Sequence, residues 1–264
     1  MTHHARIAIL VTLIAALLLA GCQSATPGAD QNTYDGIQVG FTEEGYPYLG
    51  SPEAPVTVQE FTDYLCPYCA RHVSQVEPAL IEQYIRPGQV RLIFRDNPIA
   101  SLHPTSSQGH QAAICVGEQG AALFWAMHDR LFAEQSTWGA LADPTDYLAT
   151  VAKEVGADVK DYTACVESGR AQERIDATLA EAQSYGYSGT PMFRITGTGT
   201  DNAYTVRGAQ ELTAFAAYID PLLASERPGL AWARRTGPPH APPPVAGTAR
   251  IGAARWPSRC PPCR

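Results

Sequence analysis

Two cysteines two residues apart, Cys66 and Cys69, are the residues of this chain best suited to do chemistry. A pair at this spacing can cycle between a dithiol and a disulfide, and its thiolate is the reactive species in thiol-disulfide exchange. Pro67 follows Cys66 directly, and proline is favoured in the first turn of a helix. The motif therefore predicts a redox-active dithiol that begins at a helix N-terminus.

The same spacing also occurs in structural disulfides and in half of a tetrathiolate zinc site. A zinc site would need a second pair, and the available one, Cys260 and Cys263, lies in a Pro- and Arg-rich segment without a surrounding core. A structural disulfide stays open as an alternative. The strand, turn and helix around Cys66 favour the redox interpretation.

The flanking residues predict the elements that position this pair. Residues 56–61 alternate like a buried strand, and residues 66–85 carry apolar side chains at helical spacing. At the start of this helix, free backbone N–H groups and the helix dipole stabilise a thiolate. We therefore expect Cys66 to have a lowered pKa.

The remaining pattern predicts an α/β fold. Further strands are expected at 90–95, 192–196 and 203–207, several helices between about 105 and 185, and a last helix at 210–224. Because a long helical block interrupts the strands, we expect a helical subdomain inserted at about 100–186 into a domain spanning 50–226. Residues 22–49 are expected to form a tether and an N-terminal strand.

Residues 1–21 have the pattern of a secretory signal peptide, with Arg6 followed by an apolar run over 7–20. This run ends in Leu19-Ala20-Gly21-Cys22, which resembles the lipobox of bacterial lipoproteins. We therefore expect lipid attachment at Cys22 and a membrane-anchored, extracytoplasmic location, in the periplasm or at the cell surface. Disulfides form and persist in such compartments.

Charge is distributed unevenly along the chain. Residues 227–264 hold seven of the 19 Lys and Arg residues and none of the 26 Asp and Glu, which leaves a net charge of −14 on residues 1–226. An acidic domain is unsuited to binding nucleic acid. The segment 227–264 also holds nine of 21 prolines and is predicted to be disordered. A genuine extension and a shifted reading frame both remain open for it.

Several motifs occur in one order along the chain. They are Asp63-Tyr64-Leu65-Cys66-Pro67-Tyr68-Cys69, His103-Pro104, Phe124-Trp125-Ala126-Met127-His128-Asp129 and Ser188-Gly189-Thr190-Pro191-Met192-Phe193. With Glu60 six residues before Cys66, they make residues 50–225 resemble the DsbA-like thiol:disulfide oxidoreductases of the thioredoxin superfamily. The fold that this implies is a thioredoxin-like fold with an inserted all-helical subdomain.

The resemblance also implies roles for single residues. Cys66 matches an exposed nucleophilic cysteine and Cys69 a buried resolving cysteine. Pro191 matches a cis-proline beside the dithiol, and the backbone of Thr190 before it would pair with an extended substrate segment. Glu60 matches a buried acid that relays a proton to or from Cys69, although a partly exposed strand residue is an alternative.

Two residues near the dithiol leave its redox strength open. Tyr68 stands where strongly oxidising members of the family carry histidine, and this position tunes thiolate stability. His72, one turn into the helix, would add positive charge near Cys66 if it were protonated, but a solvated position is equally compatible with the sequence.

Together these patterns predict an extracytoplasmic oxidoreductase that exchanges its disulfide with cysteines of exported proteins, in the direction of oxidation. The alternatives are a reductase or isomerase, and a non-catalytic thioredoxin-like binding lipoprotein. We expect a monomer that requires no metal or organic cofactor. The resemblance implies a quinone-linked membrane partner as reoxidant.

Cys115 and Cys165, in the predicted helical block, are expected to form a structural disulfide. In an exported chain a bridge is favoured over two buried thiols, and closing a loop of this length would stabilise the fold by roughly 4 kcal/mol. Two separate small core residues are the alternative.

Overall fold

The computed structural model describes residues 32–225, which contain a seven-stranded sheet. The strands are β1 (Thr33–Tyr34), β2 (Ile37–Phe41), β3 (Pro47–Leu49), β4 (Val56–Thr62), β5 (Val90–Asp96), β6 (Met192–Gly197) and β7 (Ala203–Arg207). Their order across the sheet is β1-β2-β3-β5-β4-β6-β7. The strand that leads to Cys66, β4, is therefore flanked on both sides, by β5 in parallel and by β6 in antiparallel orientation.

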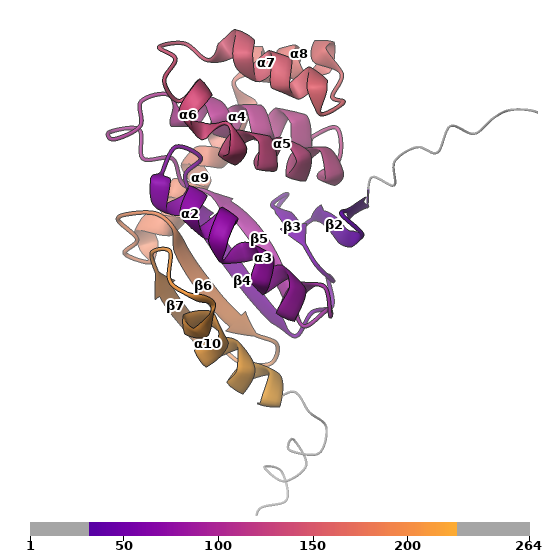
Figure 1. Cartoon of the computed structure of the whole chain (residues 1–264), viewed down its shortest axis with the longest axis vertical. Coiled ribbons are helices and arrows are strands. Elements are labelled where there is room, and N and C mark those ends of the chain that lie inside the picture. The colour runs from indigo at the N-terminus through magenta and orange to yellow at the C-terminus, as the bar shows by residue number, and fades with distance from the viewer. Residues whose placement is uncertain (1–31, 226–264) are drawn as a thin grey trace, which may run out of the picture. The chain divides into compact units, whose positions relative to one another are not determined.

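The helices form two groups, those inserted between β5 and β6 and those outside this insertion. They are α2 (Pro67–Gln75), α3 (Glu77–Leu80), the π-helical segment η1 (Ile81–Ile85), α4 (Ser106–Gly117), α5 (Ala121–Ala133), α6 (Gln135–Trp138), α7 (Thr145–Glu154), α8 (Val159–Ser168), α9 (Arg170–Ser184) and α10 (Leu212–Ser225). Helices α4 to α9 lie between β5 and β6 in the chain, so the predicted α/β fold with a helical insertion is confirmed. Figure 1 shows α4 to α8 stacked beyond one end of the sheet.

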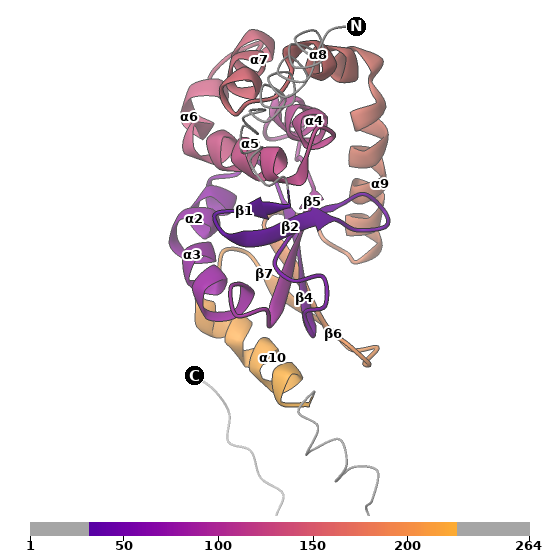
Figure 2. The same cartoon turned by 90° about the vertical axis from the view of Figure 1, so that its right-hand side faces the viewer.

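Helices cover both faces of the sheet. In Figure 2 the sheet lies between two sets of helices, with α2 and α3 on one side and α9 on the other. Helix α9 contacts β5, and α10 contacts β4 and β6. None of the helices within residues 32–225 combines the length and the hydrophobicity needed to cross a lipid bilayer. The predicted signal peptide (1–21), the lipidation site Cys22 and the segment 227–264 lie outside the described residues.

The sheet begins earlier in the chain than predicted. Residues 22–49 were expected to supply a tether and one strand, but β1, β2 and β3 all join the sheet before residue 50. The reason is that β3 pairs with β5 and closes an edge that would otherwise be exposed. The indole N–H of Trp125 on α5 donates to the Tyr48 carbonyl over 3.1 Å, which ties this hairpin to the helical block.

The helix predicted over 66–85 is broken. Helix α2 ends at Gln75 and α3 begins at Glu77, with Val76 between them at φ −114°. Pro78 explains the break, because it has no N–H to donate to the carbonyl of Ser74 and its ring would clash with that carbonyl. As a result Glu77 becomes the first residue of a new helical turn, where its side chain is buried.

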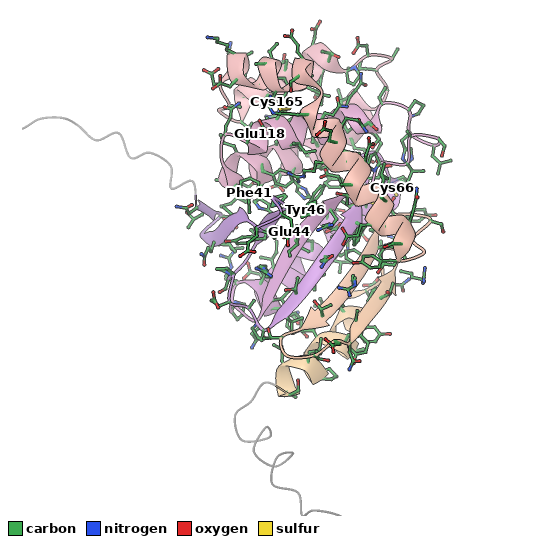
Figure 3. The ribbon with its side chains drawn as sticks, turned by 180° about the vertical axis from the view of Figure 1, so that it is seen from behind. Phe41, Glu44, Tyr46, Cys66, Glu118 and Cys165 are labelled. Carbon is green, nitrogen blue, oxygen red and sulfur yellow. A yellow bond between two sulfur atoms is a disulfide. The ribbon has the colours of Figure 1, made fainter. Side chains whose placement is uncertain are left out.

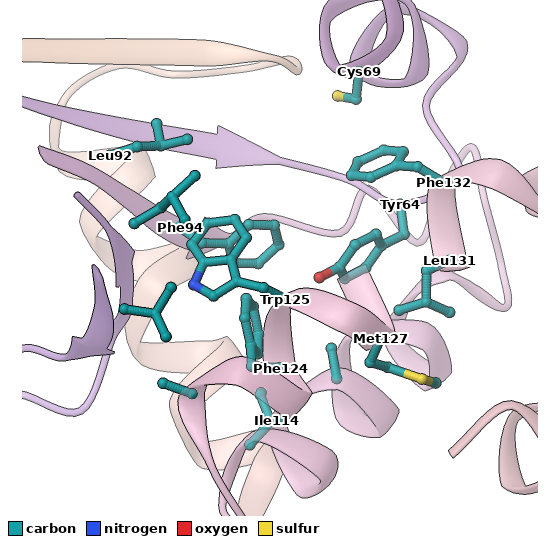
Figure 4. Close-up of a cluster of buried hydrophobic side chains, with 14 of the residues drawn as sticks. Tyr64, Cys69, Leu92, Phe94, Ile114, Phe124, Trp125, Met127, Leu131 and Phe132 are labelled. Atoms are coloured by element: carbon teal, nitrogen blue, oxygen red, sulfur yellow. The ribbon is translucent and has the colours of Figure 1, made fainter. Parts of the chain in front are cut away.

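An aromatic cluster joins the sheet to the helical block (Figure 4). Its fully buried members include Tyr64, Phe94, Phe124 and Trp125. Tyr64 lies only two residues before Cys66, and its ring stacks on Phe94 of β5 with 5.3 Å between the ring centroids. The segment that carries the dithiol is therefore anchored in the main hydrophobic core.

The structure contains the predicted Cys115–Cys165 disulfide, which links α4 to α8 with a Cα–Cα distance of 5.6 Å. Both cysteines are buried. Figure 3 shows Cys165 within the helical block, well apart from Cys66. This bridge is thus a structural element of the helical insertion and separate from the dithiol.

Candidate active site

Cys66 occupies the N-cap position of α2, with extended backbone angles of φ −74° and ψ 123°. Pro67 takes the first helical position, where its missing N–H costs no hydrogen bond. The Ala70 N–H donates to the Cys66 carbonyl over 3.1 Å and so closes the first turn. The structure therefore confirms that Cys66 lies at the N-terminus of a helix, the positive end of the helix dipole.

A cis-proline loop lies beside Cys66. The Thr190–Pro191 peptide bond is cis, as the resemblance implied, and the Cys66 Sγ lies 3.5 Å from the Thr190 carbonyl oxygen. Strand register produces this contact, because Met192 at the start of β6 pairs with Phe61 near the end of β4. The Pro191 carbonyl accepts from the Gly208 N–H over 2.8 Å, which leaves the Thr190 carbonyl facing the thiol.

The pKa of Cys66 is lowered to about 5. The largest cause is hydrogen bonding with the Cys69 side chain, which stabilises the thiolate against the opposing effect of burial. Thr190 and the backbone N–H groups of Cys69 and Tyr68 lower the pKa further. The predicted direction of the shift is confirmed, but the partner thiol contributes more than the helix terminus.

Cys69 has the opposite acidity. Its side chain is fully buried, and burial followed by the proximity of Cys66 raises its pKa well above the ordinary value. In the dithiol form Cys66 therefore carries the negative charge and Cys69 the proton. Cys66 itself is less exposed than predicted, at only 6%, because the cis-proline loop lies against its sulfur.

Glu60 lies on β4 and is buried, with an exposed fraction of 1%. The alternative of a partly exposed strand residue is therefore wrong. Side chains alternate along a strand, so Glu60 shares a face with Val58 and Thr62. Burial raises the pKa of its carboxyl to about 7, which the nearby Thr62 opposes only in part. A carboxyl with this pKa exchanges protons near neutral pH.

Tyr68 is exposed, at 58%. The guanidinium of Arg71 lies 5.2 Å from the centroid of its ring, a cation–π arrangement. Arg71 also donates to the Ala209 carbonyl over 2.9 Å, which connects α2 to the turn after β7. Tyr68 thus presents a ring to solvent beside the dithiol.

His72 does not supply the positive charge that its position suggested. It follows Cys69 by three residues, so both point from α2 towards the sheet, and the side chain is fully buried. Its ring lies 4.5 Å from that of Phe193 and 5.5 Å from that of Phe215, between centroids. Burial lowers the pKa of His72 to about 3, so the imidazole is neutral.

Two residues that the sequence did not single out hold the segment before Cys66. The buried Asp63 carboxylate accepts the backbone N–H groups of Leu65 and Ile99, each over 2.8 Å. The amide of Gln135 donates to the carbonyls of Tyr64 and Cys66 over 2.7 and 3.1 Å. Asp63 lies inside a recognised motif, but Gln135 is far away in the chain and has no sequence signal.

Residues 42–214 match the model of a protein family described as Thioredoxin. The chain therefore belongs to the thioredoxin family. Among curated proteins, the Na(+)/H(+) antiporter NhaA 3 of Salinispora tropica is 34% identical over 169 residues, covering 63% of this chain but only 24% of that protein. Disulfide bond formation protein D of Bacillus subtilis is 34% identical over 93 residues, which are 35% of this chain and 40% of that protein.

Solved structures show the same fold. The crystal structure of α-DsbA1 from Wolbachia pipientis superposes with a TM-score of 0.61 at 22% identity, covering 74% of this chain and 96% of that one. Oxidised BdbD from Bacillus subtilis gives a TM-score of 0.61 at 21% identity, covering 69% and 95%. The thioredoxin-like fold with a helical insertion is thus the fold of DsbA structures.

Proposed function

We propose that this protein is a thiol:disulfide oxidoreductase that exchanges a Cys66–Cys69 disulfide with cysteines of other proteins. The observation that carries the proposal is the opposite acidity of the two sulfurs, with Cys66 at about pKa 5 and Cys69 well above its ordinary value. A stable thiolate is a good leaving group. The fold of DsbA structures and the cis-proline loop beside Cys66 support the same function.

The reaction begins when a substrate thiolate attacks the Cys66 Sγ of the oxidised enzyme. A bond forms between the substrate sulfur and Cys66, the Cys66–Cys69 bond breaks, and Cys69 leaves with the electron pair. A second substrate thiolate then attacks the substrate sulfur of this mixed disulfide and releases Cys66 as a thiolate. Two electrons pass from the substrate thiols to the enzyme, and the substrate gains a disulfide.

Glu60 is proposed to supply the proton that Cys69 needs when it leaves. The high pKa of Cys69 means that its thiolate must be protonated, and a carboxyl with a pKa of about 7 can deliver a proton at neutral pH. Thr62, which lowers the pKa of both Glu60 and Cys69, lies on the same strand two residues away. Reoxidation of the dithiol would return the proton to Glu60.

The direction is proposed to be oxidation. A depressed pKa of Cys66 stabilises the reduced enzyme relative to the disulfide, because only the dithiol form contains the thiolate. This raises the reduction potential, which makes the enzyme a better oxidant. We place the potential between those of thioredoxin, about −270 mV, and DsbA, about −120 mV.

The proposed site of action is outside the cytoplasm, on exported proteins. The buried Cys115–Cys165 disulfide supports an oxidising compartment, and the apolar run before Cys22 supports export and lipid anchoring. We propose that a quinone-linked membrane protein reoxidises the dithiol, and that the chain acts as a monomer.

Equilibration of the protein with glutathione tests this function. A potential between the two reference values supports an oxidase, whereas a value at or below that of thioredoxin favours a reductase or isomerase. Oxidation of a reduced model substrate should be lost in Cys66→Ser. Binding of substrate by the wild type without any oxidation of it would instead favour a binding lipoprotein without thiol chemistry.

A further inference from the structure

Three ionisable side chains meet in the core on the face of the sheet that α2 covers. They are Glu60 from β4, His72 from α2 and Glu77 from α3. One potential ligand atom from each lies within 4.8 Å of those of the other two. Their exposed fractions are 1%, 0% and 5%, so the cluster is excluded from bulk solvent.

Polar atoms of this cluster have no partner. Within residues 32–225, neither ring nitrogen of His72 accepts or donates a hydrogen bond, and the same holds for Oε1 of Glu60 and Oε2 of Glu77. A buried polar atom without a partner costs about 1–3 kcal/mol, and a charged one costs more. Four such atoms in one place indicate that another group satisfies them.

The electrostatic surroundings favour a cation as this group. After burial itself, the groups that raise the pKa of Glu77 are two further carboxylates, Glu60 and Asp129. His72 contributes no charge because burial keeps its imidazole neutral. Two carboxylates and a neutral imidazole carry two negative charges when ionised, which a divalent ion would cancel.

We propose that Glu60, His72 and Glu77 bind a divalent transition-metal ion, with Zn²⁺ as the ion to be tested. Imidazole nitrogen and carboxylate oxygen are ordinary zinc ligands, at about 2.0–2.2 Å from the metal. Three such ligands on a tetrahedral ion lie roughly 3.3 Å apart, so side chains already within 4.8 Å need only small rotations.

A cavity adjoins the proposed site at Glu77. Glu77 lines a cavity of about 430 Å³ between α2, α3 and α5, together with Glu82 and Arg86 on the surface. Asp129 of α5 lines the same cavity. The cavity can hold water, which would complete the coordination of an ion held by three protein ligands.

This site requires neither thiol, but it shares Glu60 with the proposed proton transfer to Cys69. The experiment therefore uses the full-length protein with its Cys66–Cys69 disulfide formed and its other thiols alkylated. After treatment with EDTA, Zn²⁺ is titrated by calorimetry, and the melting temperature is measured with and without Zn²⁺. The variants are His72→Phe and Glu77→Gln, and Glu82→Gln on the neighbouring turn is the matched control.

We expect wild type and Glu82→Gln to bind one Zn²⁺ in the core and to melt at a higher temperature with it. Each of the two ligand variants should weaken this binding at least about 100-fold and lose the shift in melting temperature. A direct ligand matters more than the groups that only orient the ligands, and those groups already contribute about 10–100-fold. Without metal, Glu77→Gln should melt no lower than wild type, because it removes a buried carboxyl.

Absence of Zn²⁺ binding in wild type would overturn the proposal. Equal binding by wild type and Glu77→Gln would also overturn it, by placing the ion on donors elsewhere in the chain. If the variants do not fold, the absorption spectrum of wild type with Co²⁺ decides. Ligand-field bands without sulfur-to-metal charge transfer support the His and carboxylate site, and their absence contradicts it.

Discussion

The two sulfurs of the dithiol differ in acidity, and a serine at either position should separate their roles. In Cys69→Ser, a mixed disulfide on Cys66 has no internal thiol to resolve it, so covalent adducts with substrate proteins should accumulate. Cys66→Ser should form none, because the remaining sulfur is fully buried and its pKa is high. Non-reducing gels measure both, and equal adduct yields would contradict the assignment of nucleophile and resolving cysteine.

The thiolate of Cys66 should also be visible in a pH titration. Ultraviolet absorbance of the reduced protein should rise with a midpoint near pH 5, the pKa of this thiol. Because this value lies below the ordinary 9.0, ionisation stabilises the reduced fold progressively as the pH rises from 5 to 9, and this contribution is lost as the pH falls through 5. The oxidised protein and Cys66→Ser are the controls, and neither should show the transition.

Tyr68 offers a test of how the motif tunes the potential. Replacing it by histidine should raise the reduction potential, because a protonated imidazole next to the helix N-terminus stabilises the thiolate of the reduced form. Arg71 already places a guanidinium over the Tyr68 ring, so Tyr68→Phe is the matched control that keeps this contact. Glutathione equilibration gives both potentials. A lower potential in Tyr68→His would contradict the argument.

Among the structural elements, α4 and α8 depend on their covalent link. Replacing both Cys115 and Cys165 by alanine opens a loop with a sequence separation of 50 residues and should cost about 4 kcal/mol of unfolding free energy in the chain-entropy model. Denaturant unfolding of the variant and wild type measures the loss. Activity per folded molecule should not change, since the bridge is separate from Cys66. A loss of activity in fully folded variant would show that the helical block shapes the dithiol site.

At the level of the whole molecule, the segment after Glu226 should be dispensable. It is rich in arginine and proline and has no hydrophobic period with which to form a core. A chain that ends at Glu226 should therefore keep the melting temperature and the rate of substrate oxidation of the full-length protein. A large fall in either would show that this segment contributes to the fold or to the site.

Many of the features that sequence reasoning predicted correctly depend on near neighbours in the chain. Alternating residues at 56–61 predicted β4, and Pro67 after Cys66 predicted the start of α2. The cis bond at Pro191 followed from the family motif. Only one of the three N-terminal strands was expected. The reason is that β1 and β3 are only two and three residues long, too short for a periodic pattern.

The environment of each side chain was decided by the packing of distant segments. Glu60, His72 and Glu77 are of types that are usually exposed, and no local pattern shows that three elements bring them together in the core. Likewise, Gln135 reaches the dithiol segment only because the helical block folds back over the end of the sheet. Local sequence therefore determined which residues could react, since the motif and its helix are contiguous. Tertiary structure determined their pKa values, because burial and the proximity of other groups depend on contacts between remote parts of the chain.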